Sequence, residues 1–326
     1  MALFASPSHS RQLYETVKTA IAACESAGDI STNLLAAQVL RALHEVSQGL
    51  YPAAYYSVGS CIRSCMTLGL HDKRTAAALG PQVDAWTEIE ERRRLWWASL
   101  ILDRYVHAGF TFRPLFNPVL DRSEVLPADD TAWDGGYISP NSLLVMSFGS
   151  TATAAPFARL CQAAHLLGKS CQHAEDRFSA VDADYHAQEA YSLGRAASSF
   201  LALIEQELAD TEQGCKHNLY GAFGLCCSAL LSLYYTHCCL DDDALTLADE
   251  ESKVRDQGIR IELQRFAIAG LATITQKVLD FSQELCDMCE GGMVNLANPL
   301  VLNALYQTVQ YLQLLDITEK GACEPF

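Results

Sequence analysis

The segment from Ile89 to Arg104, IEERRRLWWASLILDR, restricts the fold more than any other part of the 326-residue chain. Its second half, LWWASLIL at 95–102, would be apolar on every side of a helix. A helix that is apolar all round is stable only when other parts of the protein enclose it. The segment therefore predicts a multi-helical protein with this helix inside.

The acidic residues ahead of the apolar run have basic residues at helical spacing. Glu88 and Arg92, like Glu90 and Arg94, are four residues apart, which favours ion pairs along the helix surface. Negative charge in the first turns also complements the helix dipole. The sequence thus predicts an ordinary solvated helix start that leads into a buried segment.

Asp103 and Arg104 follow the apolar run directly. Neighbours in sequence point about 100° apart on a helix, so we expect that they do not simply pair with each other. If they are buried, each needs a partner from elsewhere, because an unpaired buried charge is costly. Arg113, beyond the turn, is one candidate for Asp103. We favour buried structural pairing over a frayed, hydrated helix end, and neither version is catalytic.

Helical periodicity extends over nearly the whole chain. Ser31 or Thr32 suits the N-cap of one helix, and Gly49 suits its C-terminal end. Pro52 suits the first turn of the next helix, which ends near Gly69. The predicted helices cover residues 31–48, 52–69, 84–109, 142–175 with an interruption near Pro156, 184–211, 216–240, 254–287 and 299–315.

Residues 110–140 have a different composition from the rest. Four prolines and the Gly135-Gly136 pair predict a long ordered loop there, without a helix. No period-2 strand pattern of useful length and no internal repeat is found. The fold class is therefore all-α, a multi-helical bundle with a long Pro-containing loop near 110–140.

Composition and charge narrow the classes of function. The formal net charge of −16 repels phosphates, so this chain alone is a poor DNA binder. Thirteen cysteines in no small-domain disulfide spacing favour a reducing, intracellular compartment, as does the lack of an apolar leader in MALFASPSHSRQLYETVK. Cys226-Cys227 and Cys238-Cys239 lie in an apolar run, where we interpret them as small hydrophobic residues.

The segment from Asn218 to Leu240, NLYGAFGLCCSALLSLYYTHCCL, carries no formal charge and is long enough to span a membrane. Its glycines, serines, threonine, asparagine and histidine favour a buried core helix instead, so no membrane partner is expected. We interpret His237 within it as a hydrogen-bonded core residue rather than a metal ligand, because buried polar groups usually find a partner.

Five short blocks occur in order between residues 69 and 133. They are GLHD at 69–72, EERRRLWW at 90–97, LDRY at 102–105, RP at 113–114, and LPADD at 126–130 with Trp133. Together they resemble the regulatory middle region of fungal transcription factors. That family includes xylanolytic activators and usually carries a zinc binuclear cluster at its N-terminus.

The resemblance implies a single helical regulatory domain over residues 1–326, with its signature part at 30–140 and a C-terminal helical part at 141–326. It implies transcription regulation in the nucleus rather than catalysis, with DNA reached only through an absent head or a partner. It leaves a small-molecule effector and a homodimer open. The signature positions that match are Arg92, Arg93, Arg94, Trp96, Trp97, Asp103, Arg104, Arg113 and Pro114. The usual Gly-Arg-Pro element departs in GFTFRP, where Phe112 directly precedes Arg113.

The zinc cluster of that family needs six cysteines, in a C-x2-C-x6-C pattern amid basic residues, because thiolate ligands must converge. Cys61 and Cys65 are separated by three residues on a predicted helix, and Cys286-Asp-Met-Cys289 is a solitary C-x-x-C. We therefore expect no cofactor in this chain, and zinc only in a DNA-binding head that it lacks.

Two other functions stay open. Carboxylates spaced like the magnesium motifs of class I terpene cyclases occur at Asp129, Asp130 and Asp134 and at Asp242, Thr246 and Glu250. The first group, however, falls in the Pro-rich loop and not on a helix. A non-enzymatic scaffold is the other alternative, since LNALYQTVQYLQLL at 302–315 suits either the protein's own core, which we favour, or a partner.

Overall fold

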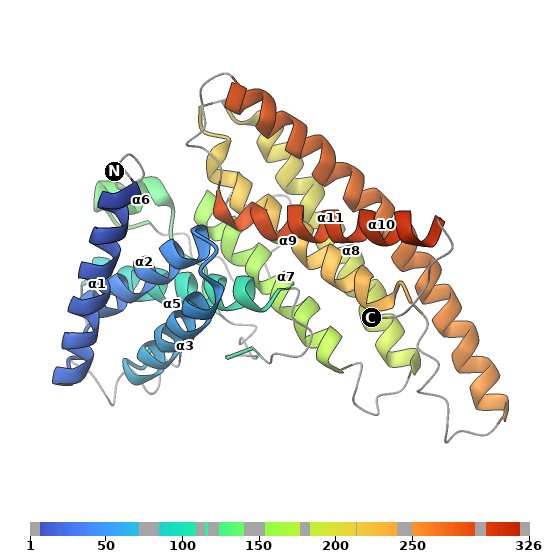
Figure 1. Ribbon diagram of the computed structural model, residues 1–326, viewed down its shortest axis with the longest axis horizontal. Coiled ribbons are helices and arrows are strands. Elements are labelled where there is room, and N and C mark those ends of the chain that lie inside the picture. The colour runs from blue at the N-terminus through green and yellow to red at the C-terminus, as the bar shows by residue number, and fades with distance from the viewer. Residues whose placement is uncertain are drawn as a thin grey trace. The chain divides into compact units, whose positions relative to one another are not determined.

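The computed structural model describes residues 7–71, 85–108, 115–116, 124–139, 154–176, 183–212, 214–239, 250–290 and 298–319 (Figure 1). Over this part of the chain the regular elements are helices and no strand occurs, which confirms the predicted all-α class. The chain divides into two compact units. Unit 1 comprises Met1–Val106 and Phe116–Cys161, and unit 2 comprises His107–Leu115 and Gln162–Phe326.

Unit 1 contains α1 (Pro7–Ala27), α2 (Thr32–Ser47), α3 (Tyr51–Thr67), α6 (Asp130–Gly135), the first residues of α7 (Pro156–Asp176), and all but the last residue of α5 (Trp86–His107). Helices α2 and α3 pack against each other, and α1 packs on α2 (Figure 1). The Tyr14 hydroxyl donates a hydrogen bond of 2.8 Å to Glu45 Oε1, which joins α1 to α2. Helix α1 precedes residue 31, where the first helix was predicted, so it was missed.

The predicted ends of α2 and α3 are confirmed. Ser31 is the N-cap of α2, and its side chain accepts a hydrogen bond from Leu34 N. Gly49 and Gly69 have φ angles of 67° and 69°, a left-handed conformation that glycine adopts without strain. Leu35, Val39, Leu43 and Val46 recur at helical spacing along α2, and all are buried except Leu43, which is exposed.

The prediction that residues 110–140 contain no helix is wrong at α6. Asp129 caps this short helix by accepting from Ala132 N at 3.0 Å, and Gly136, with a φ of 67°, ends it. Six residues are too few to produce a recognisable periodicity, so the capping residues were the only local signal.

Unit 2 is organised around α9 (His217–His237), which packs against α8 (Ala183–Asp210), α10 (Glu250–Glu290), α11 (Leu302–Glu319) and the 3-10 turn η4 (Pro299–Val301) (Figure 1). Small residues allow this close packing. A Cβ atom at Gly270 of α10 would lie 2.4 Å from the Tyr234 ring, and one at Gly224 of α9 only 2.7 Å from the Val301 Cα atom.

Among the described helices, α9 is the one that is long and apolar enough to cross a membrane, with a mean hydropathy of 1.3 over its most apolar window. However, 89% of that window is buried by the rest of the protein. The interpretation of this segment as a core helix is therefore confirmed.

Candidate functional site

Glu90 is the centre of a buried network at the start of α5. We expected it in a solvated helix start, but its side chain has 0% exposed surface. Its Oε1 accepts a hydrogen bond of 2.7 Å from Ala128 N and one of 3.1 Å from Arg94 Nε, and its Oε2 accepts from Arg93 Nη1. The expectation of an exposed pair is wrong because the backbone at residue 128 covers Glu90 and supplies it with a donor.

Arg94 connects α5 to the two elements that follow the LPADD block. Its Nη2 donates to Ala128 O at 3.0 Å and to Asp130 Oδ1 at 2.9 Å. The guanidinium carbon lies 5.0 Å from the centre of the Trp133 ring and 5.3 Å from that of Phe157. Asp130 Oδ2 in turn accepts from Phe157 N at 3.2 Å, at the start of α7. One arginine thus joins α5, α6 and the first turn of α7.

The two adjacent tryptophans are both buried, as predicted. Trp97 donates from Nε1 to Val125 O at 3.0 Å, just before the LPADD block. Trp96 is equally enclosed. By contrast, Arg92 forms the expected surface pair with Glu88 at 3.4 Å. Of the signature side chains, Arg94 and Trp97 therefore bind residues 125–130, whereas Arg92 pairs with the exposed Glu88.

Asp103 and Arg104 are buried, as we favoured, but they pair with each other. The expectation that they do not is wrong because helix geometry fixes only the direction of the Cβ atoms, and the long arginine side chain folds back over its neighbour. Asp103 Oδ1 also accepts a hydrogen bond of 3.2 Å from Phe116 N. Arg113, proposed as its partner, and Pro114 lie outside the described residues.

These contacts define what the signature side chains can do. Their charges are compensated inside the fold, and they join segments 34 to 38 residues apart. A buried, hydrogen-bonded charge network holds one arrangement of the chain, because breaking it leaves uncompensated charge behind. The network can therefore hold the conformation of unit 1.

Unit 2 contains a cavity of about 380 Å³ between α8, α9 and α10. The aromatic ring of Phe281 lies 4.4 Å from that of Phe223 and 5.1 Å from that of Tyr220, between ring centres. Polar groups surround these rings, among them the Lys277–Glu205 ion pair at 2.5 Å. The lining residues are Glu205, Leu208, Ala209, Lys216, Tyr220, Phe223, Lys277, Asp280, Phe281 and Glu284.

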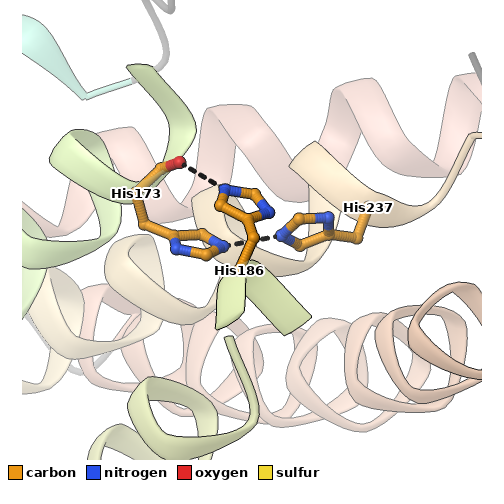
Figure 2. Close-up of side chains that lie close together, drawn as sticks. All are labelled: His173, His186 and His237. Atoms are coloured by element: carbon orange, nitrogen blue, oxygen red, sulfur yellow. Dashed lines mark hydrogen bonds between the residues drawn. The ribbon is translucent and has the colours of Figure 1, made fainter. Parts of the chain in front are cut away.

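Three of the nine histidines, which look scattered in the sequence, meet in unit 2 (Figure 2). His173 lies near the end of α7, His186 in the first turn of α8, and His237 at the end of α9. One ring nitrogen of each lies within 4.8 Å of those of the other two. The expectation that His237 is hydrogen-bonded is confirmed, since its Nε2 lies 2.9 Å from His173 Nε2.

His173 is the most enclosed member of this histidine cluster. Burial lowers its pKa below the usual 6.5, while the hydrogen bond between its Nδ1 and Glu189 Oε2, at 2.8 Å, acts in the opposite direction. The only sequence signal for the cluster was that all three histidines lie within a few residues of a predicted helix end. Their separations of 13 and 51 residues match no metal-binding motif.

Five of the described cysteines are buried, namely Cys61, Cys65, Cys161, Cys226 and Cys227. Burial raises the pKa of both Cys61 and Cys65 to about 12, and the Cys65 thiol donates to Ser99 Oγ at 3.3 Å. The interpretation of Cys226 and Cys227 as small hydrophobic residues is confirmed by their complete burial. The same interpretation of Cys238 and Cys239 is wrong, because these residues follow the end of α9 and reach the surface, with their sulfur atoms 3.7 Å apart.

The carboxylates that suggested a cyclase have other roles where they are described. Asp129 caps α6, and Asp130 binds Arg94 and the first turn of α7. Asp134 is exposed. Asp242 and Thr246 lie outside the described residues, as does the side chain of Glu250. Two of these six residues, Asp129 and Asp130, therefore form hydrogen bonds or ion pairs within the fold.

The helical architecture and the buried network around Glu90 and Arg94 define an all-α domain in which charged side chains join separate segments of unit 1. The chain belongs to the family of the fungal specific transcription factor domain, whose profile matches residues 2–196. Transcription factor BOA15 of Botryotinia fuckeliana is 42% identical over 82 residues, which are 25% of this chain and 45% of that protein. Transcription factor tazR of Aspergillus terreus is 30% identical over 80 residues, or 24% of this chain and 13% of that protein.

The chain thus covers less than half the length of these curated relatives. No solved structure matches. Family membership and the relatives' names together indicate a regulatory role in transcription, and they favour a protein that is not an enzyme.

Proposed function

We propose that the chain is a nuclear regulatory domain that reaches DNA only through another segment or a partner, and that it changes how strongly that DNA-bound protein activates transcription. The observation that carries this proposal is the network around Glu90 and Arg94, in which the signature arginines Arg93 and Arg94 bind acidic side chains and a backbone carbonyl group of the same unit. The net charge of −16 supports an indirect route to DNA, because phosphate binding needs a basic surface.

A transcription reporter tests this function. The full chain is fused to an unrelated DNA-binding domain, and transcription is measured from a promoter that carries that domain's site. We expect output that differs from that of the DNA-binding domain alone, and nuclear accumulation of a fluorescent fusion expressed in a fungal host. Unchanged output together with exclusion from the nucleus would refute the proposal. Duplex DNA binding by the purified chain at low salt, with and without zinc, tests the indirect route, and any binding would contradict it.

We further propose that the cavity of unit 2 binds a small-molecule effector. Its volume of about 380 Å³ lies within the range of ligand sites, about 300–1,000 Å³. The aromatic floor favours a compound with an aromatic body, and the lining offers both acidic and basic side chains to its polar groups. Such a ligand regulates only if it binds two conformations with different affinity.

A fluorescent dye of that chemistry, anilinonaphthalene sulfonate, is a direct probe of the cavity. We expect one dye per chain, and loss of that binding in Ala209→Trp, where the new side chain fills the space. Ala272→Trp on the exposed face of α10 is the matched control and should bind the dye like the wild type. Equal binding by both variants would place the dye elsewhere and exclude the cavity as its site.

A homodimer is a second partner that we propose. The buried face of α11 includes Ala304, Thr308 and Tyr311, in accordance with the expected core packing. A second stripe on the same helix is exposed and largely apolar, at Leu302, Tyr306, Val309 and Leu312. Apolar stripes of this length often bury against a partner. Light scattering should give a dimer for the wild type and a monomer for Tyr306→Glu, and a wild-type monomer would rule out this partner.

A further inference from the structure

The structure assigns a binding site for a divalent transition-metal ion, with Zn²⁺ as the reference ion, to His173, His186 and His237. The proposal concerns unit 2 alone. It does not depend on the proposed role in transcription, because metal binding is measured on the purified chain. The ligands come from the ends of three different helices, so a bound ion would fasten α7, α8 and α9 together (Figure 2).

The convergence of the ring nitrogens is the first argument. Zinc–imidazole bonds of about 2.0–2.1 Å in a tetrahedral site place two ligand nitrogens about 3.3 Å apart. His173 Nε2 and His237 Nε2 are 2.9 Å apart, and the three ligand atoms lie within 4.8 Å of one another. Side-chain shifts of well under one ångström for the first pair would therefore admit the ion.

The second argument is the orientation of His173. Glu189 Oε2 can only accept, so the hydrogen bond of 2.8 Å places the proton of the neutral ring on His173 Nδ1. The lone pair of Nε2 then points at His237, which donates to it in the metal-free form. A carboxylate that fixes the outer nitrogen of a histidine is the usual support of a metal-binding imidazole. Glu189 is accordingly a positioning residue.

His186 must move to complete the site. Its ring is stacked on that of His173, with ring centres 3.9 Å apart and planes 12° from parallel. Two parallel rings cannot direct their in-plane lone pairs at one ion, so the His186 ring must turn away from the stack. Doing so gives up the hydrogen bond of 3.1 Å between its Nε2 and the His173 carbonyl oxygen. Metal binding therefore replaces two hydrogen bonds of His173, the one between its Nε2 and His237 Nε2 and the one between its carbonyl oxygen and His186 Nε2.

The local electrostatics favour a cation. His237 is the last residue of α9, and His173 is three residues before the end of α7. The C-terminal ends of helices carry partial negative charge, so these two ends favour a cation, whereas the N-terminal end of α8 at His186 carries partial positive charge. Glu189 and Asp176 both act on His173 as negative charges. His186 and His237 are partly exposed, which gives an ion a path from solvent.

The ligand set defines the class of ion. Three imidazoles suit Zn²⁺, Cu²⁺, Ni²⁺ and Co²⁺ and exclude Mg²⁺ and Ca²⁺, which prefer oxygen. Structural zinc sites use four protein ligands, whereas three leave a coordination position for water or another small ligand. We therefore expect a reversible site, not one on which folding of the whole chain depends.

The test is a Co²⁺ titration of the full chain after chelator treatment and dialysis, followed by competition with Zn²⁺. We expect one Co²⁺ per chain, with visible d–d absorption typical of four or five ligands and no thiolate charge-transfer band in the near ultraviolet. Zn²⁺ should displace Co²⁺. Substituting any of the three histidines by alanine should abolish the spectrum, and His71→Ala, at an exposed histidine of unit 1, should leave it unchanged.

Two further variants separate this site from its neighbours. Glu189→Ala should weaken Co²⁺ affinity by about 10–100-fold without changing the ligand count. The double variant Cys238→Ser, Cys239→Ser should bind like the wild type, although these thiols directly follow His237. A thiolate band that this double variant removes would overturn the proposal, as would the absence of one-to-one binding in a chain whose circular dichroism shows it to be folded.

Discussion

Glu90→Gln is the most informative single substitution for the buried network of unit 1. The change keeps the shape of the side chain and removes only its charge. Glutamine can still accept from Ala128 N, but its amide nitrogen then faces a guanidinium group. Two charge-assisted hydrogen bonds, from Arg93 and Arg94, are therefore weakened or lost.

The loss of unfolding free energy caused by Glu90→Gln depends on how deeply each partner of Glu90 is buried. Separating a fully buried ion pair costs about 3–5 kcal/mol, and hydrogen bonds to charged groups are worth about 1.5–3 kcal/mol each. Arg93 and Arg94 keep 22% and 17% of their side chains exposed, so water partly compensates them. Arg94 also keeps Asp130 as a partner. We therefore expect Glu90→Gln to lower the free energy of unfolding of unit 1 by about 3 kcal/mol.

Tryptophan fluorescence during urea unfolding measures this quantity for unit 1 alone, because all four tryptophans lie in it. Glu88→Gln is the matched control. Its ion pair with Arg92 is 3.4 Å long and Glu88 is 46% exposed, so its loss should cost less than about 0.5 kcal/mol. Equal shifts of the two urea midpoints would refute the conclusion that Glu90 is the centre of the network.

Three further substitutions and one chemical reaction test other parts of the fold. Trp96→Ala removes a fully enclosed ring and should lower the free energy of unfolding by about 3–5 kcal/mol. Thermal melts followed by circular dichroism measure this loss, and a variant of full stability would disprove the burial of Trp96. Gly224→Ala would place a Cβ atom 2.7 Å from a backbone Cα atom of η4 and should destabilise unit 2 by about 1–3 kcal/mol in urea. Gly258 lies inside α10 with open space around it, so Gly258→Ala should instead stabilise unit 2 by up to about 1 kcal/mol. Stability changes of the same sign in the two glycine variants would contradict the packing described. Alkylation by iodoacetamide at pH 8 should modify the exposed Cys286 and spare the buried Cys65, whose pKa is raised to about 12. Mass spectrometry of the peptides measures both, and faster modification of Cys65 than of Cys286 would contradict this prediction.

Features with a local cause were predictable from the sequence. Ser31, Gly49 and Gly69 act on backbone groups within a few residues, so their types alone indicate where α2 and α3 begin and end. The burial of α9 was predictable for a different reason, since a helix without a polar face has no side to turn to water.

Features with a distant cause were not predictable. The partner that buries Glu90 is a backbone N–H group 38 residues away, and spacing along α5 contains no information about it. The pairing of Asp103 with Arg104 was missed because a rule about Cβ directions was applied to a long, flexible side chain. The histidine cluster depends on three helix ends meeting in space, which the separations in sequence do not encode.

The two proposed sites of unit 2 use opposite ends of the same helices. His186 lies in the first turn of α8, and Glu205 of the cavity is 19 residues further on, a distance of about 28 Å along the helix axis. Likewise, Tyr220 lies near the start of α9 and His237 ends it. At that separation a metal ion and a cavity ligand cannot interact directly, so any effect of one on the other must come from a shift of α8 or α9 as a body. Such coupling has to be reciprocal: a tenfold gain in ligand affinity on metal binding, about 1.4 kcal/mol, requires a tenfold gain in metal affinity when the ligand binds.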